Sequence, residues 1–374
     1  MIFNDLDLDI YLKELEYIVN IDTGSDNPAG IEKMANFFID KYKEIGCITE
    51  IFRPAPNRGP CVKIQNKPSD RYDVLMLCHM DTVFPVGTVK KRSFRVEGGY
   101  AFGPGVCDMK SGLLSAFYLF KWFSEHSEID ISLCLLMNSD EEIGSMASTP
   151  WIKEHAFKSG IAIVFEPGRV DGSFVVERKG TAKYEIEFKG LAAHAGVDPE
   201  KGKSAITEMA SWMIKLDILN NYDEGVTLNT GIVSGGTAAN VVADYAYMKL
   251  DVRFKNLNQA QIITDTLNTM STEPFIEGVE ATVRQVSFRE PMNPNERTLE
   301  LLEKLRTIGE KYGIPITLKS TGGVSDGNGV SALGIPVIDG FGPVGGFSHS
   351  EKEYTDIESI KLRFRLLLDL ILSL

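Results

Sequence analysis

The stretch Tyr72–Asp81, which reads YDVLMLCHMD, decides the fold class of this 374-residue chain. Its apolar run is continuous rather than alternating, which is typical of a strand buried on both faces of a sheet. Two later stretches repeat the pattern: Ile131–Glu142, ISLCLLMNSDEE, and Ile161–Gly168, IAIVFEPG. Each apolar run ends in His, Asp or Glu, and segments with helical periodicity lie between them. This α/β alternation predicts a mostly parallel sheet flanked by helices, with ligand-binding groups at the carboxyl ends of its strands.

A second pattern begins near residue 180. Thr181–Gly190 alternates polar and apolar residues, as a half-solvated strand does. The elements that follow it, in order, are a helix over 204–219, strands over 226–236 and 243–254, a helix over 259–270 and a strand over 280–288. The order β-α-β-β-α-β predicts a ferredoxin-like α+β domain. We therefore predict a larger domain from residues 1–179 and 290–374, with a smaller domain, 180–289, inserted into it.

The composition excludes several classes of function. Apolar residues make up 43% of the chain and charged residues 24%, as in soluble globular proteins. The formal net charge is -13 and no basic cluster occurs, which argues against a nucleic-acid partner. The chain shows neither a membrane-spanning stretch nor the features of a signal peptide. Five cysteines without a C-x-x-C pair favour reduced thiols, so we expect a cytoplasmic protein that has no membrane partner.

The first candidate site residues are His79 and Asp81 at the end of the first stretch. Residues two apart on a strand share a face, so both side chains point the same way. A histidine that binds a metal usually needs a carboxylate behind it to fix its ring, and Asp81 could provide it. The alternative is a polar strand end without a ligand. We interpret Cys78 and Cys107 as small buried core residues.

Three more carboxylates stand at turns or strand ends. Asp108 follows the turn-forming residues of AFGPGVCDMKSG and could bridge two cations, or it could be a helix N-cap. Glu141 and Glu142 are adjacent, so one could bind metal while the other exchanges protons, unless both lie in an exposed acidic turn. Glu166 ends an apolar strand, where an unpaired carboxylate is costly.

A second histidine completes the set of candidate ligands. His349 lies in the glycine-rich stretch GGFSHSEKEY, whereas His126 and His155 lie in polar helical contexts and are expected to face solvent. Two histidines and three acids are thus available for metal, and one glutamate is left over. Such ligands suit zinc, and also cobalt or manganese. Two metal ions that share a carboxylate and a water are a known hydrolytic design.

Taken in order, these motifs resemble those of the co-catalytic metallopeptidases, which include glutamate carboxypeptidase, dipeptidases, tripeptidases, aminoacylase and succinyl-diaminopimelate desuccinylase. The likeness is strongest to the glutamate carboxypeptidase branch. It spans residues 75 to 354 and rests on these segments: LMLCHMDTVFPVG, GPGVCDMKSG, NSDEEIGS, VFEPG, GLAAHAGVDPEKGKSAI, TAANVV, LDVRF, TGGVSDGNGVSALGIPVI and GGFSHSEKEY.

The resemblance implies roles for the larger domain. Asp108 would bridge two zinc ions, and a cis peptide would follow it. His79 and Glu166 would complete one metal site, and Glu142 and His349 the other. The remaining two acids would be catalytic, Asp81 by orienting His79 and Glu141 as the general base and acid. The fold implied is a zinc-exopeptidase-like catalytic domain.

The resemblance also assigns roles for substrate binding. In the small domain, His194, Asn240 and Arg253 match positions that contact substrate, and the domain would be a lid through which a homodimer forms. His194 and Asn240 would act at the partner's site, while Arg253 would hold a terminal carboxylate. Gly345 and Gly346 would let the backbone approach the substrate closely.

Two departures from the family pattern bear on packing and specificity. The family often has glycine where this chain has Ser111, a difference that concerns helix packing. The segment Ser325–Gly327 reads Ser-Asp-Gly, where the family frequently has alanine in the last position. The second departure concerns substrate specificity and leaves the metal ligands intact.

The function predicted is metal-dependent hydrolysis of an amide bond, with release of an amino acid from a small peptide or N-acyl amino acid by a carboxypeptidase-like exopeptidase. The alternatives are an aminopeptidase, dipeptidase or N-acyl amino acid deacylase on the same scaffold, or a catalytically silent relative. A silent relative would lack the spare glutamate or a ligand, and all six residues are present. A dinucleotide-dependent oxidoreductase is disfavoured because no G-x-G-x-x-G follows a first strand with an acid downstream.

Overall fold

The computed structural model describes residues 6–374, so the first five residues of the predicted larger domain lie outside it. The chain forms two compact units. Unit 1 holds the residues up to Glu177 together with Met292–Ser320 and Ser325–Leu374. Unit 2 holds Arg178–Pro291 and Thr321–Val324.

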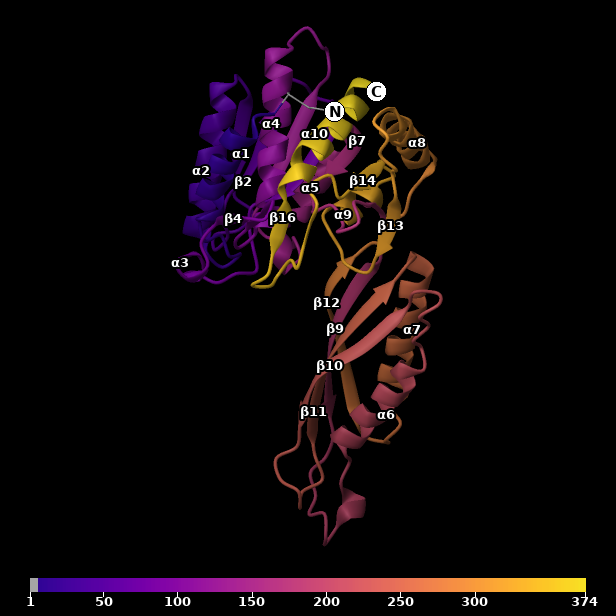
Figure 1. Cartoon of the computed structure of the whole chain (residues 1–374). Helices are drawn as coiled ribbons and strands as arrows, with labels where there is room; N and C mark the ends of the chain where they lie inside the picture. Colours follow the sequence, from indigo (N-terminus) through magenta and orange to yellow (C-terminus); the bar gives the residue numbers. More distant parts are fainter. Residues whose placement is uncertain (1–5) are drawn as a thin grey trace. The chain divides into compact units, whose positions relative to one another are not determined.

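Unit 1 is built on a mixed, mainly parallel sheet (Figure 1). Its strands, in spatial order, are β1 (Ile48–Phe52), β2 (Cys61–Gln65), β6 (Leu133–Asn138), β3 (Tyr72–His79), β7 (Ser159–Val164), β14 (Val337–Asp339), β8 (Phe174–Arg178) and β13 (Leu318–Thr321). Strand β3 pairs in parallel with β6 and β7, with His79 opposite Asn138 and Leu77 opposite Val164. The three strands that end in polar residues are therefore neighbours, and their carboxyl ends lie at one edge.

Helices cover both faces of this sheet, as the continuous apolar runs predict. Alternate residues of β3 divide between two cores: Val74, Met76 and Cys78 pack on one side, and Leu75 and Leu77 on the other. The first core includes residues of α1 (Leu8–Val19), α2 (Pro28–Glu44), α4 (Ser111–Glu125), α8 (Glu296–Lys311) and α10 (Ile357–Leu372). The second includes residues of α5 (Thr149–Ala156) and α9 (Gly327–Ser331). Burial on both faces explains why β3 shows no alternation in sequence.

A small antiparallel sheet was not predicted from the sequence. It consists of β15 (Gly345–Gly346), β16 (Tyr354–Asp356), β5 (Tyr100–Phe102) and β4 (Arg95–Glu97), paired in that order, with the short helix α3 (Thr88–Lys91) just before β4 in the chain. Strands of two or three residues are too short to show periodicity. The sheet joins a segment near residue 100 to one near residue 350, so it brings distant parts of the chain together.

Unit 2 has the predicted order of elements. They are β9 (Gly180–Lys189), the turn η3 (Pro199–Lys201), α6 (Ala205–Asp217), β10 (Thr227–Gly235), β11 (Tyr245–Phe254), α7 (Leu257–Thr272) and β12 (Glu280–Arg289). The strands pair antiparallel in the order β10-β11-β9-β12, and both helices pack on this sheet. The predicted fold class, an α/β unit with an inserted ferredoxin-like α+β unit, is confirmed.

Two details differ from the sequence interpretation. Thr321–Val324, expected in the larger domain, belongs to unit 2 because Arg178 donates to Gly323 O at 3.2 Å and Lys179 N to Thr321 O at 3.1 Å. The expectation that His155 faces solvent is wrong. Its side chain is 6% exposed and its Nδ1 lies 3.2 Å from the Tyr72 hydroxyl.

Candidate metal centre

His79 is the last residue of β3, and its ring is fixed from behind. Nδ1 lies 2.9 Å from the backbone oxygen of Asp81, so the ring presents Nε2 to the opposite side. The Asp81 carboxylate is fully buried and accepts hydrogen bonds from the Ser25 hydroxyl at 2.6 Å and from the backbone N–H groups of Glu141 and Glu142, both at 3.1 Å. Asp81 thus fixes His79 and also holds the loop that follows β6.

Asp108 lies in the turn before α4, where the irregular segment η1 (Val106–Lys110) replaces the regular helical start. Gly105 has φ +70°, which favours glycine, and the Asp108–Met109 peptide is cis, as the resemblance implied. The two carboxylate oxygens of Asp108 serve different histidines. Oδ1 lies 3.1 Å from His79 Nε2 and Oδ2 lies 3.3 Å from His349 Nε2. This is the disposition expected of a bridging carboxylate.

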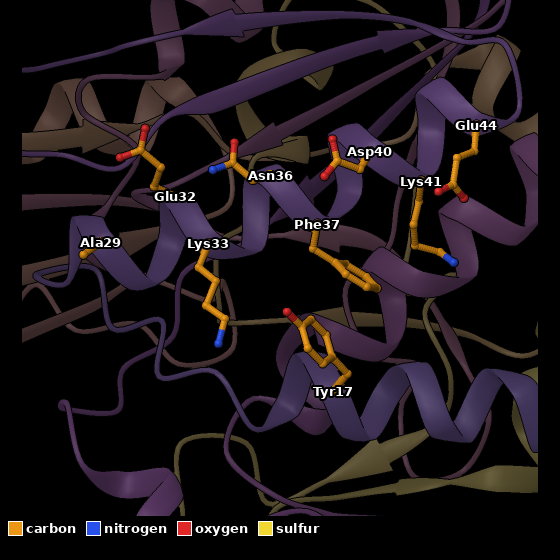
Figure 2. A pocket seen from close by; sticks show the side chains of 9 residues that line it. All are labelled: Tyr17, Ala29, Glu32, Lys33, Asn36, Phe37, Asp40, Lys41 and Glu44. Atoms are coloured by element: carbon orange, nitrogen blue, oxygen red, sulfur yellow. The ribbon is translucent and has the colours of Figure 1, made fainter.

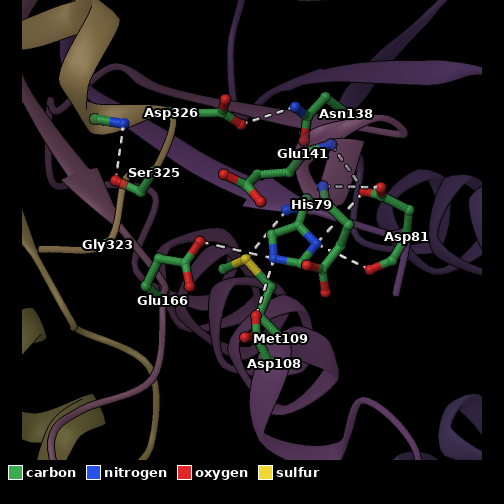
Figure 3. Close-up of polar contacts among 12 residues, drawn as sticks. His79, Asp81, Asp108, Met109, Asn138, Glu141, Glu166, Gly323, Ser325 and Asp326 are labelled. Carbon is green, nitrogen blue, oxygen red and sulfur yellow. Dashed lines mark hydrogen bonds and ion pairs between the residues drawn. The ribbon is translucent and has the colours of Figure 1, made fainter. Parts of the chain in front are cut away.

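Glu141 and Glu142 form the short 3-10 turn η2 (Glu141–Ile143) after β6. The Glu142 side chain is only 6% exposed, and its Oε2 lies 3.1 Å from His349 Nε2. Figure 3 shows the Glu141 carboxylate close to His79 and Glu166. The same view shows Asp326, which accepts hydrogen bonds from Asn138 at 2.7 Å and Ser145 at 2.5 Å. These two residues flank the turn, so Asp326 connects the segment around the turn to the residues just before α9. The alternative of an exposed acidic turn is wrong for Glu142.

Glu166 and His349 complete the cluster. Glu166 follows β7, and its Oε1 lies 3.7 Å from His79 Nε2. His349 lies in the loop between β15 and β16 with φ +65°, a left-handed conformation that is uncommon outside glycine. Its ring is about half exposed, at 52%, unlike the buried ring of His79. All the predicted metal ligands, with Glu141 and Asp81, are therefore close together in unit 1.

The electrostatics of the cluster favour added positive charge. Burial raises the pKa of Glu142, and burial together with the nearby Asp108 charge raises the pKa of Glu166 well above its usual range. Hydrogen bonds to Asp108 and Glu142 raise the pKa of His349 to about 10. Burial opposes charge on His79, but Asp108 and Asp81 still hold its pKa well above its ordinary value. The burial and mutual proximity of these acids thus favour a bound positive charge at this place.

The residues fit divalent metal ions. Ligand atoms of His79, Asp108 and Glu142 lie within 4.8 Å of one another, as do those of His79, Glu141 and Glu166. Glu142 Oε1 is buried without a hydrogen-bond partner among the described residues, which is a costly arrangement for a carboxylate unless a cation accompanies it. Imidazole and carboxylate ligands suit zinc, manganese or cobalt.

The predicted substrate-binding residues of unit 2 lie at opposite ends of its sheet. Ala195 N donates to Asn240 O at 3.0 Å, so the His194 and Asn240 loops are adjacent, beyond the end of the sheet where Tyr245 faces Lys189. Arg253 is at the other end, and a two-point ion pair joins it to Asp251, with N–O distances of 2.8 and 3.1 Å. The sequence analysis did not consider this ion pair, although residues two apart on a strand share a face.

The structure gives Gly345 a packing role. A Cβ atom at Gly345 would come within 2.3 Å of Cys107 Sγ, so the position requires glycine irrespective of any substrate. At Gly346 a Cβ would lie 3.1 Å from the Tyr354 ring. The predicted approach of these glycines to substrate stays a prediction.

Sequence analysis missed two residues that support the site, Ser25 and Glu353. Ser25 lies in the loop between α1 and α2, a segment that the sequence analysis did not single out. Glu353 lies four residues after His349 in the same quoted stretch. The available signal was an acid four residues from a predicted ligand, and its burial could not be read from the sequence.

A surface pocket of about 760 Å³ lies between α1 and α2 (Figure 2). Tyr17 and Phe37 line it together with charged side chains, and their rings lie 4.9 Å apart. None of its lining residues belongs to the metal cluster, so the pocket is separate from the site.

Comparisons with known proteins find relatives over most of the chain. A sequence model of "Peptidase family M20/M25/M40" matches residues 75–373. Carboxypeptidase G2 of Pseudomonas sp. (strain RS-16) is 29% identical over 97% of this chain and 89% of its own length. Succinyl-diaminopimelate desuccinylase of Zymomonas mobilis is 27% identical over 74% of this chain and 75% of its own.

Solved structures share the fold. Aminopeptidase PepT from Bacillus cereus superposes with a TM-score of 0.80 at 22% identity, covering 98% of this chain and 99% of that one. The metallo-carboxypeptidase Sso-CP2 from Sulfolobus solfataricus gives 0.75 at 17% identity, covering 96% and 98%. Residues 6–374 contain no helix with the length and apolarity that a membrane crossing requires.

Proposed function

The chain belongs to peptidase family M20/M25/M40 and is a metal-dependent hydrolase of amide bonds, and we propose that it acts as a carboxypeptidase-like exopeptidase at a pair of zinc ions. The observation that carries the proposal is the position of Asp108, whose two oxygens face two different histidines. The relative matched over nearly the whole chain is named a carboxypeptidase, which favours release of a terminal amino acid over deacylation.

The ligands divide between two metal positions that share Asp108. We assign His79 and Glu166 to one and Glu142 and His349 to the other. Bound zinc would supply Lewis acidity, which polarises the scissile carbonyl and makes water a better acid. The chain's own part is to hold these ligands in place and to move protons.

Glu141 is the proposed proton carrier. Its carboxylate would accept a proton from the attacking water and deliver it to the amide nitrogen as the C–N bond breaks, so that nitrogen leaves as a neutral amine and the acyl group as a carboxylate. Its backbone N–H is fixed by Asp81 at 3.1 Å, which holds the start of the turn still. The adjacent Glu142 lies beside His349 and is assigned to metal binding, so it takes no part in the proton transfer.

Substrate recognition is assigned to unit 2. Arg253 would bind the terminal carboxylate of the substrate, and the pair with Asp251 would hold its guanidinium in one orientation. Removal of Arg253 should lower kcat/KM for substrates with a free carboxylate and leave kcat/KM for amidated substrates unchanged. Equal losses on the two substrate types would remove Arg253 from this role.

We further propose a homodimer in which His194 and Asn240 serve the partner's site. They lie at the opposite end of the sheet from Arg253, so one copy is poorly suited to use all three at one substrate. β10 is an edge strand, and the neighbouring α6 exposes Ile214 and Ile218 at 68% and 73%. Such an apolar edge fits a second copy of the same unit.

Complementation tests the shared site. Variants His194→Ala and Glu141→Gln should each be inactive alone, and a refolded mixture of them should recover part of the activity, because one site in each mixed dimer is intact. A mixture as inactive as its components, from a protein that is dimeric by sedimentation, would place His194 in its own subunit's site.

We also propose a cytoplasmic location, which the five buried cysteines support.

The central test is a substrate panel. The zinc-loaded protein should hydrolyse dipeptides and N-acyl amino acids with a free C-terminal carboxylate, and chelation should abolish the activity until zinc is restored. Activity that needs a free N-terminus instead would favour an aminopeptidase. Activity on N-acyl amino acids alone would favour a deacylase.

A further inference from the structure

Glu353 is a fully buried acid that the proposed reaction does not use. Its carboxylate accepts hydrogen bonds from three backbone N–H groups in one turn. They come from Gly105 at 3.0 Å, Cys107 at 2.9 Å and Asp108 at 3.0 Å. The last donor is the backbone of the residue whose carboxylate faces both histidines. Glu353 therefore fixes the peptide from which the bridging carboxylate projects.

Glu353 also belongs to the segment that carries His349. Two residues on, Thr355 donates its hydroxyl to Val106 O at 3.0 Å, and strand β16 pairs with β5. Glu353 N also lies 3.4 Å from Ser350 O, within the His349 loop. One short segment thus holds His349 and, through Glu353, holds Asp108. The two groups meet at 3.3 Å although they come from distant parts of the sequence.

The electrostatic surroundings of Glu353 are unfavourable. Glu353 lies in the interior beside another carboxylate, Asp108, and a buried charge is costly even when hydrogen bonds satisfy it. A neutral acceptor could satisfy some of the same N–H groups. An anion at this place orients the N–H groups strongly, because hydrogen bonds to a charged acceptor are shorter and stronger than neutral ones.

We propose that Glu353 is a positioning residue, which sets Asp108 so that its two oxygens face two metal positions. The proposal rests on the proposed function. It predicts that the loss of the Glu353 charge lowers metal affinity. The loss of a buried charge that holds no metal ligand should lower only the melting temperature. Groups that orient metal ligands typically contribute about 10–100-fold to metal affinity.

Unit 2 offers a matched control, Glu208. It is also fully buried, and its carboxylate accepts the backbone N–H groups of Phe275 at 3.1 Å and Ile276 at 2.6 Å and the Trp212 indole N–H at 2.8 Å. Glu208 belongs to the core of unit 2, whereas the cluster belongs to unit 1. Glu208→Gln therefore makes the same chemical change where no metal ligand is attached.

The experiment compares Glu353→Gln and Glu208→Gln in the full-length protein. Zinc affinity is measured by competition with a chromophoric chelator, and the visible spectrum of the cobalt-loaded protein reports ligand geometry. Both variants should melt at a lower temperature. Glu353→Gln should also lose about 10–100-fold in affinity for at least one ion and change the cobalt spectrum. Glu208→Gln should keep both native values.

Native zinc affinity and a native cobalt spectrum in Glu353→Gln would overturn the proposal while leaving the proposed function intact. A failure of the unmodified protein to bind zinc would overturn both. If Glu353→Gln does not fold, Glu353→Asp and Thr355→Val decide the matter. The shortened acid should lower metal affinity, and Thr355→Val, which changes the same strand without touching Asp108 N, should not. An equal loss in these two variants would assign the effect to segment packing and reject Glu353.

Discussion

Two buried glutamates, Glu142 in unit 1 and Glu208 in unit 2, show how differently one residue type is used. Glu208 has three hydrogen-bond donors on its carboxylate. Glu142 has His349 on one oxygen, while its other oxygen is buried without a partner among the described residues. A buried acid with three donors meets its hydrogen-bonding needs within the fold. An unsatisfied one, crowded by other acids, is costly and is expected where a bound cation compensates.

The largest expected effect comes from Glu141, which is adjacent to Glu142 and is not among the proposed metal ligands. Glu141→Gln should lower kcat by about 10²–10⁴-fold, because the proposed proton carrier is lost while the proposed metal ligands remain. Steady-state kinetics and metal analysis of the same sample would check this. A variant with near-native kcat would show that Glu141 is not the base.

The next effect concerns the proposed metal ligand His349, whose ring is half exposed. His349→Ala should weaken metal binding by roughly 100-fold or more, since the loss of a ligand exceeds the loss of the groups behind it. Metal content after dialysis measures it. His126→Ala is the matched control, because His126 stacks on Trp122 at 3.8 Å and lies outside the cluster. Full metal occupancy in His349→Ala would exclude it as a ligand.

Removing the charge of Glu142 and of Glu208 is expected to have different effects on the melting temperature. In metal-free protein, Glu142→Gln should leave the melting temperature unchanged or raise it, because it removes a poorly compensated buried charge. Glu208→Gln should destabilise by about 1–3 kcal/mol, since its donors lose acceptors. Calorimetry with and without zinc checks both. Added zinc should stabilise the native protein and Glu208→Gln much more than Glu142→Gln. Equal destabilisation of the metal-free variants would erase the contrast.

The smallest expected effect is the pH dependence of a buried histidine outside the cluster. Burial, aided by Lys63 and Lys158, lowers the pKa of His155 to about 4. The folded state therefore favours neutral His155, and this contribution to stability is present above about pH 6.5, the ordinary histidine value, and is lost as the pH falls toward 4. In His155→Gln the melting temperature should fall less steeply over that range. Parallel curves for the two proteins would contradict the shift.

The sequence by itself determined the type of each long element and which strand ends carry polar groups. Continuous apolar runs around Leu75, Leu135 and Ile163 indicated buried parallel strands, because burial on both faces leaves no alternation. Since parallel strands end at one edge, His79, Glu142 and Glu166 were expected together. The motif order then added Asp108 and His349 by resemblance.

Only the tertiary structure decided which distant groups meet. His349 reaches Asp108 because β15 and β16 pair with β5, and strands this short have no periodicity to read. The burial of His155 and the three donors on Glu353 were invisible because they depend on contacts between segments far apart in the chain. Local pattern reports the face an element buries, whereas a contact between distant residues depends on how those faces pack.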